Sequence, residues 1–407
     1  MSPNVISYSA AISACEQGGQ WQGALVLFEK MPISRISLDV ISYNTAITAC
    51  EKGGQWQKAL IFLDTMSKSR IRLNVISYNS TISACEKGGQ WEHALALFDA
   101  IPKANISLDV ISYNAAISAC EKGGQWQHAL RLFEAMPEAR ISRSVISYNA
   151  TMSAFEKGGQ WQQALLLCEA MHKADISLDV ISCNAAISAC EKVGQWEQAL
   201  ILFKAMPTER ISPNVISYNA AISACEKGGQ WQQALILCET MHKANISLDV
   251  VSYSAAISAC EKGGQWEHAL ILFEAMPRAS VGSNVISYNA AISACEKGGQ
   301  WKHALALFDA IPKANISLDV ISYNAAISAC AKSSQWQEAL ILFEAMPKAT
   351  ISSDVISYNA AISACERGVD GSKRWCCVTH LKWRSTLSSE PCQGQNMDSF
   401  IYDVTLW

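Results

Sequence analysis

The sequence predicts an all-α fold, a solenoid of stacked helix-turn-helix hairpins, on the basis of three observations. A block close to V-I-S-Y-N-A-A-I-S-A-C-E-K-G-G-Q-W-Q-x-A-L-I-L-F-E-A-M-P recurs every 35 residues. Its apolar residues follow helical spacing rather than strand alternation. The tryptophans that mark the block keep the interval without an insertion: Trp21, Trp56, Trp91, Trp126, Trp161, Trp196, Trp231, Trp266, Trp301 and Trp336. Repeats of this length bury their apolar faces only against their neighbours.

The repeats divide the chain into four segments. We expect the remnant of a preceding repeat at residues 1–4, ten full repeats at 5–354, a partial eleventh at 355–368 and a divergent, disordered or loosely packed tail at 369–407. Residues 1–4 match the end of a later repeat, 211–214, so the chain is expected to be a fragment that begins inside a repeat. A short native start is the alternative.

Each repeat is expected to form two helices. In the fourth repeat, the first helix runs from Ser112 as its N-cap to Lys122, and Gly123-Gly124 ends it. The second restarts at Gln125 and continues until Pro137 stops it. The predicted core stripes are Tyr113, Ile117, Cys120, Trp126, Ala129, Leu130, Phe133 and Met136. Helices of about ten residues are too short to be stable alone, so stacking must hold them.

The cysteines predict buried, reduced thiols. Ten of the sixteen occupy one position of the repeat: Cys15, Cys50, Cys85, Cys120, Cys190, Cys225, Cys260, Cys295, Cys330 and Cys365. Neighbouring stacked helices lie about 9–10 Å apart, beyond the Cα separation of about 7 Å that a disulfide tolerates. Phe155 fills the position once, which disfavours an obligatory metal or redox role. No cofactor and no metal are expected.

Several features resemble the pentatricopeptide repeat (PPR) family. These are the 35-residue period, the V-I-S-Y-N opening, the lysine before Gly-Gly and the A-L-x-L-F-E-x-M second helix, over Val5 to about Gly368. The uniform repeat length is similar to the pure class of the family, and the I-S-A-C-E-K blocks resemble the uniform arrays of dinoflagellate algae. The resemblance implies a right-handed α-solenoid superhelix and binding of single-stranded RNA in a chloroplast or mitochondrion.

The implied function is sequence-specific recognition of an organellar transcript, one repeat per base, in RNA processing, stability, editing or translation. The implied partners are this RNA and a recruited RNA-processing enzyme. The longest apolar runs fall far below the roughly 18 residues that a membrane span needs, so no membrane partner is expected, and no small-molecule substrate either. The alternative is a helical-repeat scaffold that binds protein.

The fifth residue of each repeat, counted from its opening valine, is a candidate for base reading. It is an amide or a serine throughout: Ser9, Asn44, Asn79, Asn114, Asn149, Asn184, Asn219, Ser254, Asn289 and Asn324. Such a ladder suits hydrogen bonding to bases. The structural alternative is a local helix cap, a task that Ser112 and its equivalents are expected to perform already.

The thirty-fifth residue varies inside a uniform frame, which favours an information-carrying site. It reads Asp39, Asn74, Asp109, Ser144, Asp179, Asn214, Asp249, Asn284, Asp319 and Asp354. These are also ordinary turn residues. An Asp can accept from the Asn amide and turn its carbonyl towards uracil, whereas Asn or Ser can donate to that carbonyl and leave the amide for cytosine. Serine at the fifth position leaves room for a purine. The family scheme gives the pyrimidine-rich site 5′-GCUCUCUAUU-3′.

The thirteenth residue is the candidate for phosphate binding: Lys52, Lys87, Lys122, Lys157, Lys192, Lys227, Lys262, Lys297 and Lys332. A lysine at a helix C-terminus also complements the helix dipole, which is the alternative. The adjacent glutamates, such as Glu86 and Glu121, are expected on another face. The net charge of −4 lacks the basic excess usual for nucleic-acid binding. The second residue, such as Ile111, is expected either to wedge between bases or to be structural.

Catalytic constellations are absent from the repeats, so no enzyme activity is expected. His93, His128, His268 and His303 vary with other polar residues, which indicates an exposed face. In the tail, Cys377 and His380 lack a second ligand pair for zinc, and the H-x-E with paired cysteines of a deaminase extension is missing.

Overall fold

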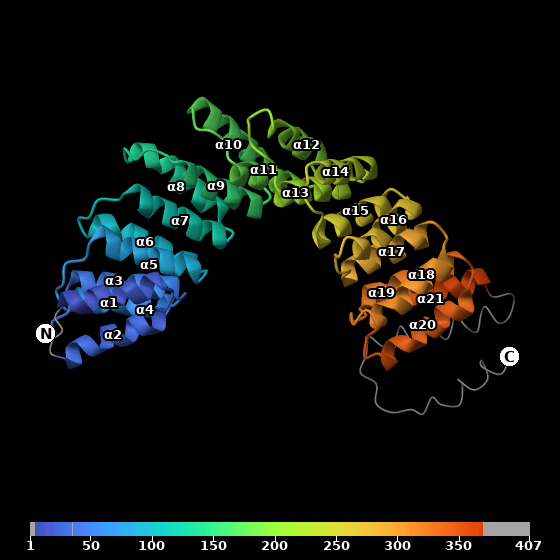
Figure 1. Cartoon of the computed structure of the whole chain (residues 1–407), viewed down its shortest axis with the longest axis horizontal. Helices are drawn as coiled ribbons and strands as arrows, with labels where there is room; N and C mark the ends of the chain where they lie inside the picture. Colours follow the sequence, from blue (N-terminus) through green and yellow to red (C-terminus); the bar gives the residue numbers. More distant parts are fainter. Residues whose placement is uncertain (1–4, 35, 369–407) are drawn as a thin grey trace. The chain divides into compact units, whose positions relative to one another are not determined.

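The computed structural model describes residues 5–34 and 36–368, and within them it contains 21 helices and no strand (Figure 1). It divides into two compact bodies, an N-terminal body up to Ala224 and a C-terminal body from Cys225. The expectations for residues 1–4 and for the tail at 369–407 fall outside the described residues.

First and second helices alternate along the chain. The first helices are α1 (Val5–Gln17), α3 (Val40–Lys52), α5 (Val75–Lys87), α7 (Val110–Lys122), α9 (Val145–Lys157), α11 (Val180–Lys192), α13 (Val215–Lys227), α15 (Val250–Lys262), α17 (Val285–Lys297), α19 (Val320–Lys332) and α21 (Val355–Gly368). The second helices are α2 (Trp21–Ile33), α4 (Trp56–Lys68), α6 (Trp91–Lys103), α8 (Trp126–Glu138), α10 (Trp161–Lys173), α12 (Trp196–Ala205), α14 (Trp231–Lys243), α16 (Trp266–Arg278), α18 (Trp301–Lys313) and α20 (Trp336–Lys348).

The helices form stacked hairpins in both bodies. In the N-terminal body each first helix packs on the next first helix, as α3 does on α5 and α5 on α7. Each also packs on its own second helix and on the preceding one, as α5 does on α6 and α4. The same pattern runs through α15, α17, α19 and α21 in the C-terminal body. The predicted all-α solenoid of helical hairpins is confirmed.

The first helices begin earlier than predicted. Helix α7 starts at Val110, and its N-cap is Asp109, whose Oδ1 accepts a 2.8 Å hydrogen bond from the backbone N–H of Ser112. The prediction that Ser112 is the N-cap is therefore wrong. Asp109 has the extended backbone of a cap residue, and Ser112 lies third in the helix, where its hydroxyl completes a capping box.

The second helices continue through the proline that was expected to stop them. Pro137 lies in the last turn of α8, which ends at Glu138. Because Pro137 has no N–H, the carbonyl of Phe133 lacks its usual helical donor. Arg143 fills this gap, since its Nε donates to that carbonyl at 3.1 Å and its guanidinium carbon lies 4.2 Å from the centre of the Phe133 ring.

The Gly-Gly pair is required by packing and by backbone conformation. At Gly123 a Cβ would collide with the indole of Trp91 from the preceding repeat, so only glycine lets the hairpins approach this closely. Gly124 has φ +68°, a left-handed conformation that glycine adopts without strain. The pair therefore ends the first helix and seats the tryptophan of the neighbouring repeat.

The predicted core stripes are largely buried. Tyr113, Ile117, Ala129, Phe133 and Met136 are buried, whereas Trp126 and Leu130 are half-buried. Nine of the ten repeat cysteines have no exposed area, and Cys15 is half-buried. Burial raises the pKa of seven of the buried thiols, that of Cys120 to about 12: Cys50, Cys85, Cys120, Cys190, Cys260, Cys295 and Cys330. No described helix combines the length and apolar character that crossing a membrane requires.

Aromatic contacts join successive hairpins. A ring of the second helix meets a tyrosine of the next first helix edge-on, as Phe133 and Tyr148 do with 4.9 Å between ring centres. The predicted exposure of the histidines is confirmed for His93, His268 and His303, whereas His128 is half-buried. Each of the four histidine rings lies 5.3–6.2 Å from the tryptophan of the preceding repeat.

Candidate nucleic-acid interface

The thirty-fifth residue of each repeat is the N-cap of the next first helix. A side-chain oxygen of this residue accepts from the backbone N–H of the serine three positions later, at 2.8 Å for Asp179 and Ser182 and 3.0 Å for Asn214 and Ser217. The same bond occurs at Asp39, Asn74, Asp109, Ser144, Asp249, Asn284, Asp319 and Asp354. This local order fixes where these polar side chains lie.

The fifth residue reaches across to this cap. In the third repeat, Asn79 Nδ2 donates to Asp109 Oδ1 at 3.0 Å, and Asn79 Oδ1 accepts from Ser112 Oγ at 2.8 Å. Ser112 Oγ also lies 2.8 Å from Asp109 Oδ1. A hydroxyl has one proton, so Ser112 can donate to only one of these two oxygens at a time. When it donates to Asp109, the carbonyl of Asn79 is available to another donor.

Eight of the predicted pairs lie within hydrogen-bond distance, and their distances separate into two classes. In the first repeat, Ser9 Oγ makes no hydrogen bond with Asp39 in the described part of the chain. Where the thirty-fifth residue is Asp, the amide nitrogen lies 2.8–3.2 Å from its nearer carboxylate oxygen, in the pairs Asn79–Asp109, Asn149–Asp179, Asn289–Asp319 and Asn324–Asp354. Where it is Asn or Ser, the donor atom of the fifth residue lies 3.3–3.5 Å away, in the pairs Asn44–Asn74, Asn114–Ser144, Asn184–Asn214 and Ser254–Asn284. Charge strengthens the first class.

The sequence predicts that the Asn side chain reverses its hydrogen bonding where the thirty-fifth residue is Asn or Ser. This reversal is not present in the structure. Where an asparagine pairs with Asn or Ser, as in the Asp pairs, its amide nitrogen faces the thirty-fifth residue, so Asn44 Nδ2 donates to Asn74 Oδ1. The prediction that Asn or Ser donates to the Asn carbonyl is therefore wrong here. Ser77 Oγ occupies that carbonyl instead, 2.7 Å from Asn44 Oδ1.

Three polar atoms of the ladder are buried without a hydrogen-bond partner in the described part of the chain. They are Asn149 Oδ1, Asn184 Oδ1 and Ser9 Oγ. Asn149 lacks one because Ser182 Oγ turns to the carbonyl of Asp179, at 2.9 Å. A buried acceptor without a donor costs stability, so these carbonyls would gain from an external N–H.

Hydrogen bonds hold two carboxylates of the ladder, those of Asp179 and Asp354, in their charged form. Burial opposes ionisation of Asp179, but hydrogen bonds from the Ser182 backbone, Asn149 and the Ser182 hydroxyl outweigh it and lower its pKa. The pKa of Asp354 is lowered in the same way, by Ser357 and Asn324. These two Asp pairs therefore present a charged acceptor to the amide at neutral pH.

An exposed aliphatic side chain accompanies each polar pair. The second residue of each repeat is 50–76% exposed: Ile6, Ile41, Ile76, Ile111, Ile146, Ile181, Ile216, Val251, Ile286, Ile321 and Ile356. A repeated isoleucine that leaves half its surface in water contributes little to the core. Its regular placement beside the cap residue marks the surface on which a flat apolar group could stack.

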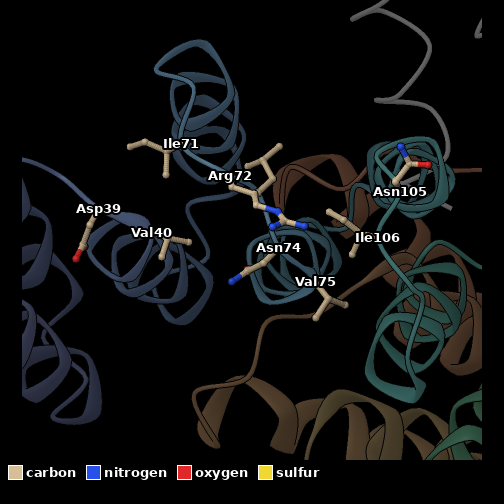
Figure 2. A pocket seen from close by; sticks show the side chains of 9 residues that line it. Asp39, Val40, Ile71, Arg72, Asn74, Val75, Asn105 and Ile106 are labelled. Carbon is tan, nitrogen blue, oxygen red and sulfur yellow. The ribbon is translucent and has the colours of Figure 1, made fainter.

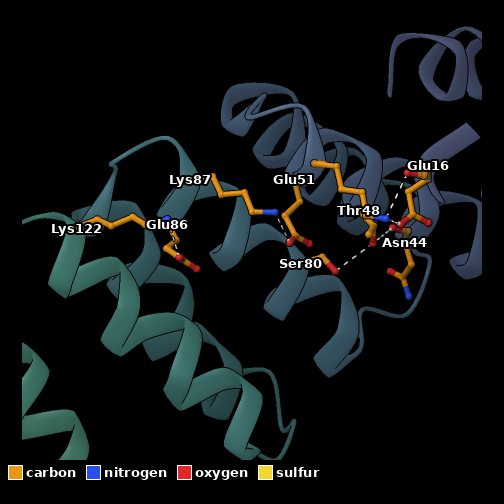
Figure 3. Close-up of polar contacts among 9 residues, drawn as sticks. Glu16, Asn44, Thr48, Glu51, Ser80, Glu86, Lys87 and Lys122 are labelled. Atoms are coloured by element: carbon orange, nitrogen blue, oxygen red, sulfur yellow. Dashed lines mark hydrogen bonds and ion pairs between the residues drawn. The ribbon is translucent and has the colours of Figure 1, made fainter. Parts of the chain in front are cut away.

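The lysine ladder is paired with acid across the hairpin junctions (Figure 3). Lys87 Nζ lies 3.0 Å from Glu51 Oε1, and Lys122 Nζ lies 2.9 Å from Glu86 Oε1. The same pairing joins Lys52, Lys157, Lys192, Lys262, Lys297 and Lys332 to the preceding repeat, at 2.6–3.7 Å. Each of these glutamates faces the lysine of the next repeat, whereas the lysine beside it on its own helix faces the preceding repeat. The sequence alone did not predict that stacking pairs the two.

These lysines keep part of their surface open. Their side chains are 39–46% exposed, whereas the partner glutamates are 12–30% exposed. Burial raises the pKa of Glu156 despite Lys192, 3.7 Å away. Asn44 and Lys52 lie eight residues apart on α3, about 12 Å along the helix. The lysines therefore flank the polar pairs on the same layer of first helices.

Protein-family models match most of the chain. The model described as PPR repeat family matches residues 3–52, 38–87, 73–120, 213–262, 283–332 and 318–367. The chain belongs to the pentatricopeptide repeat family. A second model, described as pentatricopeptide repeat domain, matches residues 166–227. A third, described as PPR repeat, matches residues 111–141, 146–176 and 251–281. Among curated protein sequences no match was found.

A solved pentatricopeptide repeat structure shares the fold. The crystal structure of PPR10 from maize aligns with a TM-score of 0.60 and 22% identity over 96% of this chain and 60% of that one. PPR10 in complex with an 18-nt psaJ RNA element aligns with a TM-score of 0.40 and 17% identity, over 96% and 75%. Yeast Rmd9p in complex with a 16-nt target RNA gives 0.38 and 10%, over 93% and 79%. This pentatricopeptide repeat chain thus spans 60% of the PPR10 chain.

Proposed function

We propose that this pentatricopeptide repeat chain binds single-stranded RNA and reads one base per repeat through the fifth and thirty-fifth residues. The observation that carries the proposal is the repeated pair of polar side chains, 2.8–3.5 Å apart, beside an exposed aliphatic side chain. Bases offer an apolar face and a hydrogen-bonding edge, and unpaired strands expose both.

The two distance classes provide a physical basis for selectivity. In an Asp pair the charged carboxylate fixes the amide nitrogen, so the Asn carbonyl points to the base and accepts the N3–H of uracil. The carbonyl of Asn149, in an Asp pair, and that of Asn184, in an Asn pair, have no donor in the described part of the chain. In an Asn or Ser pair the amide is held weakly, at 3.3–3.5 Å, and can turn its N–H to the N3 acceptor of cytosine.

Under the family scheme the proposed target is 5′-GCUCUCUAUU-3′, with C and U partly interchangeable. We place its role in a chloroplast or mitochondrion, on an organellar transcript. The protein acts there by occupancy, because a bound strand is shielded from nucleases, kept from folding, or presented to a recruited processing enzyme. Such a role in processing, stability, editing or translation needs no catalytic residue in the repeats.

Binding measurements with the full chain test this function. Fluorescence anisotropy should give tighter binding to this single-stranded RNA than to its duplex or to the DNA of the same sequence. Selection from a random RNA pool should return pyrimidine-rich sites. A preference for duplex, or a purine-rich or random selection, would contradict base reading by this ladder.

A further inference from the structure

One groove on the loop edge of the N-terminal body departs from the repeat pattern. It has a volume of about 670 Å³ and lies where the loops before α5 and α7 approach the start of α3 (Figure 2). Its lining includes the cap residues Asp39 and Asn74, and Arg72 is part of the same wall. The groove therefore opens beside two successive members of the base-reading ladder.

Arg72 is specific to this repeat. The equivalent position holds Ser37, Ser107, Ser142, Ser177, Ser212, Ser247, Gly282, Ser317 and Ser352 in the other repeats. Arg72 is exposed, and among the described residues no acid or carbonyl accepts from its guanidinium. The nearby carboxylate of Asp39 is used locally, since its Oδ1 accepts from Ser42 N at 2.8 Å and from Ser42 Oγ at 2.6 Å.

An arginine in a later loop of this edge shows which contacts a guanidinium with a structural role makes. Arg143, in the loop before α9, donates to the carbonyl of Phe133 and covers its ring. Arg72 has no such contacts in the described chain. A guanidinium carries five donors and no acceptor, so Arg72 offers an unused set of donors.

The groove favours a nucleobase over a phosphate. Val40, Val75 and Ile106 give it apolar walls, and the carboxylate of Asp39 would repel a second anion. A base suits these walls with its flat face and offers acceptor atoms at its edge, to which a planar guanidinium can donate twice.

We propose that Arg72 is a third specificity-determining residue of the second repeat, donating to acceptor atoms of the base that Asn44 and Asn74 face. The inference rests on the proposed RNA binding and deepens it. With Arg72, the second repeat has a stronger base preference than with the Asn44–Asn74 pair alone. In that pair Asn44 Nδ2 lies 3.3 Å from Asn74 Oδ1.

The test measures the RNA affinity of three full chains: the wild type, Arg72→Ser and Arg143→Leu. Each is tested on four RNAs that differ only at the nucleotide facing the second repeat. Further RNAs vary the nucleotides at the other positions. Serine and leucine stand at these positions in other repeats, so both variants keep a natural sequence. We expect Arg72→Ser to lose about fivefold or more of the base preference at that one nucleotide. Arg143→Leu should leave it unchanged.

Two results would overturn the inference while leaving RNA binding in place. One is an equal loss of affinity for all four RNAs with a flatter dependence on salt, which would make Arg72 a phosphate contact. The other is no change in any RNA. If the wild type binds none of the single strands, the proposed function itself fails.

Discussion

At the residue scale, the ladder residues serve the fold and stay available for recognition. Asp, Asn and Ser are about equally good N-caps, so capping explains why only these three occur at the thirty-fifth position. Capping does not decide which of them stands in which repeat. Asp109 and Ser144 cap α7 and α9 with the same kind of bond, yet they hold the amides of Asn79 and Asn114 at 3.0 Å and 3.5 Å. That remaining choice is what a base code can use.

Exchanging one pair should change one base. The double variant Asn114→Ser, Ser144→Asn copies the Ser254–Asn284 pair that the chain already contains. We expect the fourth base preference to move from C towards A, with a mismatch cost of about 1–3 kcal/mol by analogy with base contacts in DNA. Binding to RNAs that vary at the fourth base measures it, and preferences at the third and fifth bases serve as controls. An unchanged preference for C would refute reading by this pair.

The sequence predicts which positions form the ladder but not which other side chains of the neighbouring repeats contact them. The resemblance to the pentatricopeptide repeat family implied that Asn79 and Asp109 form one pair, and in the structure they are hydrogen-bonded. It missed that Ser112 of the next hairpin competes for the Asn79 carbonyl, because that contact depends on the stacking of two repeats. The same holds for Lys122 and Glu86, which lie 36 residues apart and meet only when hairpins stack.

At the element scale, most junctions between hairpins share one packing motif. A phenylalanine of the second helix meets the tyrosine of the next first helix edge-on, with ring centres 4.7–5.2 Å apart at seven junctions of the described chain. The junction of α10 with α11 has Cys168 and Cys183 at these two positions. Both thiols are buried, and this junction lacks the aromatic contact.

Restoring both rings should strengthen that junction. We expect Cys168→Phe with Cys183→Tyr to stabilise it by about 0.5–1.5 kcal/mol beyond the gain from burial, because the rings then meet edge-on as at other junctions. Each single substitution should give less than half of the combined gain, since the rings act as a pair. Chemical denaturation and hydrogen exchange in α10 and α11 measure the effect. A double variant no more stable than the wild type would show that these helices cannot adopt the common geometry.

The sequence predicted that each repeat forms two helices, but it did not predict the residues at which they begin and end. The 3.6-residue spacing of apolar side chains located both helices of every repeat. The ends depend on local competition. Asp109 takes the cap that was assigned to Ser112, and α8 runs past Pro137 to Glu138 because its last turn tolerates a missing N–H. Arg143, in the loop that follows α8, donates to the carbonyl of Phe133 that Pro137 leaves without a helical donor.

At the scale of the whole molecule, the charge of −4 is difficult to reconcile with a polyanionic ligand unless the cations are placed selectively. The lysine ladder has such a placement, but each lysine is shared with a glutamate of the preceding repeat. Exposed ion pairs of this kind contribute about 0–1 kcal/mol each. A phosphate that approaches the open side of the lysine would compete with the glutamate for it.

Two matched sets of variants distinguish these roles. One changes Lys122, Lys157 and Lys192 to Gln, and the other changes their partners Glu86, Glu121 and Glu156 to Gln, so both remove the same three ion pairs. Their stabilities should fall alike. The lysine set should weaken every RNA and flatten the slope of log K against log salt by about 0.7 for each phosphate that the protein no longer neutralises. The glutamate set should tighten binding, because it frees the lysines and removes negative charge near the strand. Equal effects of both sets on RNA binding, or none, would reduce the lysines to junction ion pairs.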